Sequence, residues 1–124
     1  MSKKILVVDD ELDFTYFLKA NLEQSGKYQV VVANSGKDAL ELFSKTQPDL
    51  VLLDIIMPEF DGMKTLLKLR QSDVSGKKVP IVMLSAKRDS RSILESQEYG
   101  AVDYLMKPVQ MRELMHSIDK YLKA

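Results

Sequence analysis

The chain has 124 residues and is 45% apolar, which suffices to bury the core of one compact domain. Lysine plus arginine equals aspartate plus glutamate at 18 each, so there is no overall field to hold a nucleic-acid backbone or an anionic membrane. The absence of cysteine excludes disulfides, thiolate metal sites and a cysteine nucleophile, and no apolar run reaches the length of a signal peptide or a membrane span.

The chain begins with a strand followed by a helix. Residues 5–8 form an apolar run without alternation, which is typical of a strand buried on both faces, and the run ends at Asp9 and Asp10. From residue 11 onward, apolar side chains recur at helical spacing until residues 25–26 stop the helix. The side chains predicted to face inward are Phe14, Phe17, Leu18 and Leu22.

A second strand is predicted over residues 28–33, which are mostly β-branched or aromatic. Ser35 and Asp38 then give a weak capping box at the start of a second helix. The third strand is the central one: residues 50–53 are all apolar and deliver Asp54 to the point where Pro58 forces a loop. A helix follows from about Gly62.

The last third of the chain repeats the alternation twice. Residues 80–84 predict a fourth strand that ends at Ser85. The helix predicted over residues 90–98 is the weakest, because only Ile93, Leu94 and Tyr99 near its end are apolar. Residues 102–106 predict a fifth strand that leads to Lys107 and Pro108, and an amphipathic helix closes the chain.

Five strands alternating with five helices predict an α/β fold, in which a doubly wound parallel sheet lies between two layers of helices. The carboxyl ends of parallel strands share one edge, which is where open α/β sheets bind ligands. The polar side chains predicted at this edge are Asp9, Asp10, Asp54, Ser85 and Lys107.

This set of side chains suggests phosphoryl chemistry supported by a divalent cation. Crowded carboxylates repel one another unless a cation is present, and oxygen ligands without histidine or cysteine favour Mg²⁺, with Mn²⁺ as an alternative. Lys107 and Ser85 supply a positive charge and a hydroxyl for phosphoryl oxygens, and Asp54 can act as the nucleophile. Each residue alone also has an ordinary reading: Asp9 and Asp10 as helix caps, Ser85 as a turn residue, Lys107 as a surface charge.

Four segments together resemble the receiver domain of bacterial two-component response regulators, and the resemblance covers essentially the whole chain. The segments are Ile-Leu-Val-Val-Asp-Asp-Glu at 5–11, Asp-Leu-Val-Leu-Leu-Asp-Ile-Ile-Met-Pro-Glu-Phe-Asp-Gly at 49–62, Pro-Ile-Val-Met-Leu-Ser-Ala at 80–86 and Gly-Ala-Val-Asp-Tyr-Leu-Met-Lys-Pro at 100–108. The resemblance implies a flavodoxin-like sheet of order 2-1-3-4-5 and a cis bond between Lys107 and Pro108.

The resemblance also implies a role for each site residue. Asp54 would accept a phosphoryl group from a histidine kinase or a phosphotransfer protein. Asp9, Asp10, Asp54 and the backbone carbonyl of Ile56 would bind Mg²⁺. Ser85 and Lys107 would contact the phosphoryl group, with Ser85 and Tyr104 as the switch residues.

The partners implied are equally specific. A downstream protein or output domain would bind the face made by the fourth helix, the fifth strand and the fifth helix, and a phosphorylation-dependent homodimer is an alternative. We expect residues 1–124 to form a single receiver domain that is cytoplasmic, that does not bind nucleic acid or membrane directly and that is not a turnover enzyme. Met1 resembles a natural start, and Ala124 lies where many receiver domains lead into an output domain.

Three other functions are less consistent with these residues. A phosphohydrolase with an aspartate nucleophile usually has an acid two residues further on, where this chain has Ile56. A flavin- or nucleotide-binding module would have a glycine- or hydroxyl-rich loop after the first strand, where this chain is acidic. A receiver-like scaffold that is not phosphorylated is disfavoured, because every chemical position is filled.

Overall fold

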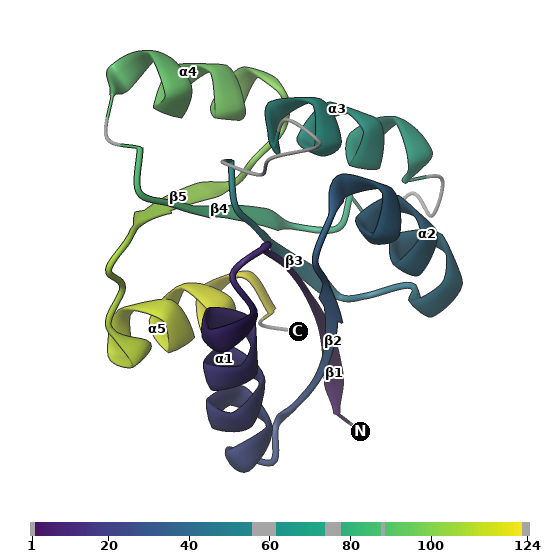
Figure 1. The fold of residues 1–124 in the computed structure, drawn as a ribbon, viewed down its shortest axis with the longest axis vertical. Helices are drawn as coiled ribbons and strands as arrows, with labels where there is room; N and C mark the ends of the chain where they lie inside the picture. The colour runs from purple at the N-terminus through teal and green to yellow at the C-terminus, as the bar shows by residue number, and fades with distance from the viewer. Residues whose placement is uncertain (1, 56–61, 74–77, 88, 123–124) are drawn as a thin grey trace.

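The protein alternates strands and helices along its whole length in a computed structural model, which describes residues 2–55, 62–73, 78–87 and 89–122 (Figure 1). The predicted order of elements is confirmed, including the weak fourth helix. The elements are β1 (Lys3–Val8), α1 (Leu12–Gln24), β2 (Tyr28–Ala33), α2 (Gly36–Thr46), β3 (Leu50–Leu53), α3 (Gly62–Ser72), β4 (Ile81–Ser85), α4 (Ser90–Glu98), β5 (Asp103–Met106) and α5 (Met111–Leu122).

The five strands form one parallel sheet in the order β2-β1-β3-β4-β5, as expected. Helices α1 and α5 cover one face of the sheet, and α2, α3 and α4 cover the other (Figure 1). Strand β3 lies in the middle, with all four of its residues buried. The chain therefore has the three-layer architecture predicted from the alternation of strands and helices.

The two faces of the sheet each contribute to a separate apolar cluster, because successive strand residues point to opposite sides. In β1, Ile5 and Val7 belong to the cluster under α1 and α5, whereas Leu6 and Val8 belong to the cluster under α2 and α3. The helix residues that complete the first cluster include Leu18, Leu22, Leu114 and Ile118, and those that complete the second include Ala39, Phe43, Met63, Leu66 and Leu69.

One side chain predicted to face inward, Phe17, is 49% exposed instead. Leu94, one of the few apolar residues of the weak fourth helix, is 58% exposed. In α1 the buried positions are Thr15, Leu18 and Leu22, which fall on one stripe at helical spacing, and Phe17 lies one residue, about 100° of rotation, away from Leu18. The helix was predicted correctly, and Leu18 and Leu22 are buried as expected, whereas the inward position of Phe17 was wrong.

Helix α5 is joined to the sheet by polar contacts as well as by apolar packing. The hydroxyl of Tyr28, at the start of β2, donates a hydrogen bond to the Asp119 carboxylate on α5. Ser117 Oγ donates to Asp103 Oδ2 at 3.0 Å, at the start of β5. Burial of Tyr28, together with the hydrogen bond and the charge of Asp119, raises the pKa of its hydroxyl to about 12. The last helix is thus linked to strands at both edges of the sheet.

The raised pKa of Tyr28 predicts how stability changes at alkaline pH. An unfolded tyrosine loses its proton near pH 10, whereas Tyr28 in the folded protein keeps its proton to about pH 12. The contribution of this protonated hydroxyl to the free energy of unfolding is therefore fully present below pH 10 and is lost as the pH rises towards 12. We expect Tyr28→Phe to lower the free energy of unfolding by about 1 kcal/mol at pH 7, and the difference from wild type to disappear by pH 12. Urea unfolding at pH 7 and above pH 11 measures this, with the exposed Tyr16→Phe as a control that should change neither value. A gap between wild type and Tyr28→Phe that stays constant with pH would contradict the assignment.

Candidate functional site

The carboxyl ends of the strands bring several of the predicted residues to one edge of the sheet. Asp9 directly follows β1, Asp54 directly follows β3, and Lys107 directly follows β5. The strand pairing extends to each of them: Asp9 N donates to Ala33 O at 3.1 Å, Asp54 N to Val8 O at 3.0 Å, and Lys107 N to Ser85 O at 2.9 Å. These backbone hydrogen bonds fix the positions of the three residues along the strand direction, just beyond the carboxyl ends of their strands.

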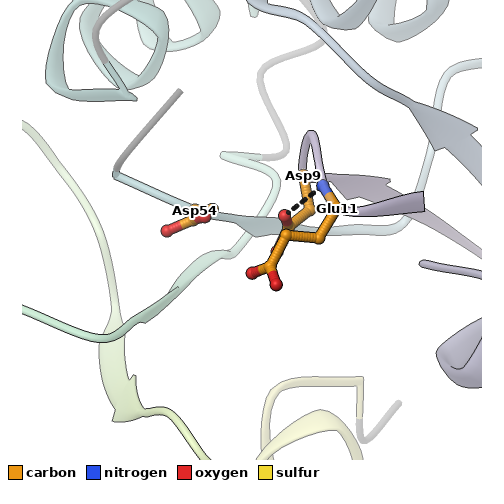
Figure 2. A group of neighbouring side chains, drawn as sticks. All are labelled: Asp9, Glu11 and Asp54. Atoms are coloured by element: carbon orange, nitrogen blue, oxygen red, sulfur yellow. Dashed lines mark hydrogen bonds between the residues drawn. The ribbon is translucent and has the colours of Figure 1, made fainter. Parts of the chain in front are cut away.

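Three carboxylates gather at this edge, and they come from two segments of the chain. Asp9 and Glu11 lie in the segment after β1, and Asp54 lies at the end of β3 (Figure 2). One oxygen from each lies within 4.8 Å of the other two. Asp9 and Asp54 are buried, with 2% and 4% of their surface exposed, whereas the Glu11 side chain is 63% exposed. Burial raises the pKa of Asp9, and the nearby Asp54 charge adds to this, whereas hydrogen bonds from Lys107 and from the Glu11 backbone partly oppose it.

Lys107 is the cation that contacts all three carboxylates. Its Nζ lies 2.6 Å from Asp9 Oδ2, 2.9 Å from Glu11 Oε1 and 3.4 Å from Asp54 Oδ2. Burial lowers the pKa of Lys107, but the hydrogen bonds to Asp9 and Glu11 and the attraction of the Asp54 and Asp9 charges outweigh it, so the pKa is raised overall. With three carboxylates against one ammonium, these four ionised side chains carry two net negative charges.

The carboxylate group suits a hard divalent cation. Mg²⁺ binds through one or two carboxylates and keeps several waters, and carboxylate oxygens are also suitable for Mn²⁺. Among the residues that the structure describes, the carboxylates brought together are Asp9, Glu11 and Asp54. Asp10, which was also predicted to bind the metal, is half-buried and is not part of this group. Ile56, whose backbone carbonyl was predicted as a further ligand, lies outside the described residues.

Glu11 is the residue of this group that the sequence reasoning missed. Glu11 is the third acid in a row after β1, but only the first two acids were predicted as site residues. Glu11 occupies the N-cap position of α1, and its side chain makes no capping hydrogen bond there. Its carboxylate faces Lys107 instead.

Ser85 and Tyr104 form a second group beside the first. Ser85 is fully buried at the end of β4, and its Oγ accepts a hydrogen bond from Lys87 N at 3.2 Å. The Tyr104 hydroxyl, from β5, donates to the Lys87 carbonyl at 2.7 Å. Burial raises the pKa of Tyr104; a hydrogen bond with Ser85 lowers it, and the charges of Asp89 and Asp54 raise it further. The Asp54 charge is the smallest of these contributions to the pKa of Tyr104.

Gly62, the first residue of α3, packs directly against the end of β3. Its N–H donates to the Ile55 carbonyl at 2.9 Å. A Cβ atom at this position would collide with the backbone of Asp54 and Ile55. A larger residue would therefore displace the strand end that carries Asp54.

Comparison with known proteins gives a consistent family match. The sequence profile described as "Response regulator receiver domain" matches residues 5–119. The chain is 40% identical over 123 residues to the alkaline phosphatase synthesis transcriptional regulatory protein PhoP of Bacillus subtilis, a match that covers 99% of this chain and 50% of PhoP. It is 41% identical to the probable transcriptional regulator ycf27 of Cyanophora paradoxa, covering 98% of this chain and 48% of that protein. The chain thus spans about half the length of these curated relatives.

Solved structures of similar fold are equally consistent. The BeF3-activated N-terminal receiver domain of Klebsiella pneumoniae RstA superposes with a TM-score of 0.89 at 32% identity, covering 98% of this chain and 100% of that one. Vibrio cholerae chemotaxis protein CheY4 superposes with a TM-score of 0.91 at 26% identity, covering 98% and 100%. The described part of the chain contains no helix long and apolar enough to span a membrane.

The close packing of Gly62 predicts a local and measurable disturbance. We expect Gly62→Ala to lower the free energy of unfolding by about 2 kcal/mol, because the backbone near Asp54 must move to accept the methyl group. In nuclear magnetic resonance (NMR) spectra the amide signals of Asp54 and Ile55 should shift. Gly26→Ala is the control: its Cβ meets nothing within 4 Å, although its φ of +78° makes alanine cost about 1 kcal/mol. Unshifted signals at Asp54 in Gly62→Ala would refute the predicted collision.

Proposed function

The chain belongs to the family of response regulator receiver domains of two-component systems, and we propose that Asp54 is its phosphoryl acceptor in a Mg²⁺-dependent reaction, for which Mn²⁺ can substitute. The donor is a histidine kinase or a phosphotransfer protein. Residues 1–124 act as one receiver domain in the cytoplasm. The domain assists its own phosphorylation and dephosphorylation but is not a turnover enzyme.

The observation that carries the proposal is the position of Asp54, buried at the end of the central strand beside Lys107 and Asp9. In the reaction an Asp54 carboxylate oxygen forms a bond to phosphorus while the bond from phosphorus to the donor imidazole nitrogen breaks, and the electron pair stays on that nitrogen. Lys107, already 3.4 Å from Asp54 Oδ2, supplies positive charge for the transferring phosphoryl oxygens. Asp9 and Asp54 would hold Mg²⁺, which neutralises charge on the phosphoryl group when bound.

Rapid turnover as a phosphohydrolase is less consistent with the site. Release of an acyl phosphate by water is accelerated by a general base within hydrogen-bond reach. The one histidine of the sequence, His116, is exposed on α5. Asp54 is paired with Lys107, an ammonium that cannot accept a proton from an attacking water, which favours a phosphoryl group that persists long enough to act as a signal.

The test of the proposal is phosphorylation with a small donor. We expect a mass increase equal to one phosphoryl group after incubation with acetyl phosphate and Mg²⁺, reduced by at least tenfold in Asp54→Asn and in excess chelator. The exposed Asp38→Asn on α2 is the matched control and should label like wild type. Equal labelling of Asp54→Asn, or labelling that persists in chelator, would reject Asp54 or the metal requirement respectively.

Phosphorylation would be transmitted through Ser85 and Tyr104 to the face made by α4, β5 and α5. The Tyr104 hydroxyl holds the Lys87 carbonyl two residues before the N-cap of α4, Asp89. Helix α4 buries only Ser92 and Ser96, and it exposes Leu94. An element with so little buried apolar surface repacks at small cost. We therefore assign this face to the downstream target or output domain, with a homodimer formed on phosphorylation as the second candidate.

This switch predicts where a phosphoryl mimic acts. Beryllofluoride with Mg²⁺ should shift NMR signals from Ser85 to Tyr104 and along α4, in addition to those that surround Asp54. Tyr104→Phe removes the hydrogen bond to Lys87 and keeps the ring, so the population of the activated state should change by about fivefold, the effect of roughly 1 kcal/mol. Shifts confined to residues that touch Asp54, in both wild type and Tyr104→Phe, would exclude the switch while leaving phosphorylation intact.

A further inference from the structure

Among its contacts with the described residues, the Lys107 ammonium lies closest to the segment that joins β1 to α1. Asp9 and Glu11 contact its Nζ at 2.6 Å and 2.9 Å, and the Phe14 ring centroid lies 4.4 Å away, within the range of a cation–π contact. The contact with Asp54, at 3.4 Å, is longer than either ion pair from that segment. The lysine therefore rests on the β1–α1 side of the site.

Glu11 is suited to hold this lysine without being fixed itself. Its backbone N–H donates to Asp9 Oδ1 at 3.0 Å, which orients the residue, whereas its side chain is 63% exposed and makes no capping hydrogen bond to α1. An exposed carboxylate keeps much of its hydration and moves at little cost. Asp9 and Asp54, by contrast, are buried at the strand ends.

A divalent cation and Lys107 compete for the same oxygens. Asp9 Oδ2 and Asp54 Oδ2 both accept hydrogen bonds from Lys107 Nζ, and the other Asp9 oxygen is already bound to the Glu11 N–H. A cation that binds these carboxylates competes with the ammonium for their oxygens and repels its positive charge. The displaced lysine needs another anionic partner nearby, and Glu11 is already in contact with it.

We propose that Glu11 is a positioning residue that retains Lys107 when a divalent cation takes its place on Asp9 and Asp54. The inference rests on the proposed Mg²⁺ site. Without the Glu11 carboxylate, the ammonium pairs more strongly with Asp9 and Asp54 and competes better with the metal. Glu11 thus favours metal binding through the lysine, and it keeps the lysine within reach of the phosphoryl group.

The first test is a Mg²⁺ titration of the full chain, in which calorimetry and NMR measure the binding. We expect Glu11→Gln to raise the Kd for Mg²⁺ about threefold, the size of a partly exposed ion pair. Asp13→Asn is the matched control, because Asp13 is an exposed acid on the first turn of α1 and its replacement removes the same charge; its effect should be less than half as large. Equal effects of the two variants would overturn the inference, because long-range charge alone would then explain them.

A double-mutant cycle separates action through the lysine from direct contact with the metal. In a Lys107→Met background, Glu11→Gln should change the Kd no more than Asp13→Asn does. An undiminished effect in that background would mean that Glu11 acts on the metal itself, and the lysine-retaining role would be wrong. If the wild-type chain binds no Mg²⁺ in the first titration, the proposed metal site is wrong and this inference fails with it. If the wild type binds Mg²⁺ and only the variants behave differently from expectation, the inference alone fails.

A second measurement needs no lysine variant. The ammonium ¹⁵N signal of Lys107 should stay observable in Mg²⁺-saturated wild type, because the ion pair with Glu11 slows proton exchange with water. In Mg²⁺-saturated Glu11→Gln the signal should broaden beyond detection. Equal visibility in both proteins would show that another group retains the lysine and would overturn the role of Glu11.

Discussion

Attraction between the Lys107 ammonium and the carboxylates of Asp9 and Asp54 joins the first, third and fifth strands of the sheet at one point. Strand β4 lies between β3 and β5, so the lysine reaches across the end of a strand to meet the acids. This is feasible only because the strands are parallel and in register, which places the residue after each strand at nearly the same height. A single antiparallel strand among these would send its last residue to the opposite edge, and the site would not form. The arrangement of the whole sheet is therefore a condition for the chemistry.

The same group of side chains is a poor way to stabilise a fold. Buried carboxylates lose hydration, and Asp54 adds repulsion at Asp9, whose pKa is raised despite two hydrogen bonds. An ion pair selected for stability alone would balance its charges, whereas among the described residues three carboxylates contact the one ammonium of Lys107. The two apolar clusters on either face of the sheet provide the stability that allows this imbalance. Excess negative charge at this partly buried edge suits a divalent cation, which when bound would offset the charge of a phosphoryl group.

Much of the fold followed from the sequence, and the exceptions have physical causes. Continuous apolar runs marked the buried strands, and the residues that follow them marked the site edge. The lateral order of the strands came from the family resemblance, because periodicity describes each strand separately. The same holds for the cis bond between Lys107 and Pro108, which is present although Xaa-Pro bonds are cis in only about 5% of cases. Glu11 was missed because nothing in its spacing distinguishes a glutamate that caps a helix from one that reaches a distant lysine.

The two groups at the site edge meet where β4 and β5 end, because Lys107 N donates to the Ser85 carbonyl at 2.9 Å. Within the second group, Lys87 joins the two residues: its N–H donates to Ser85 Oγ and its carbonyl accepts from the Tyr104 hydroxyl. The N-cap of helix α4, Asp89, lies two residues after Lys87 in the sequence. Its other end is fixed differently: Arg70 on α3 donates to the Gly100 carbonyl from Nε at 3.0 Å and from Nη2 at 2.7 Å. The two ends of α4 are thus held by different contacts: its amino end by the Asp89 carboxylate, which accepts from Ser92 N and Ser92 Oγ, and the turn after its carboxyl end by Arg70 of α3.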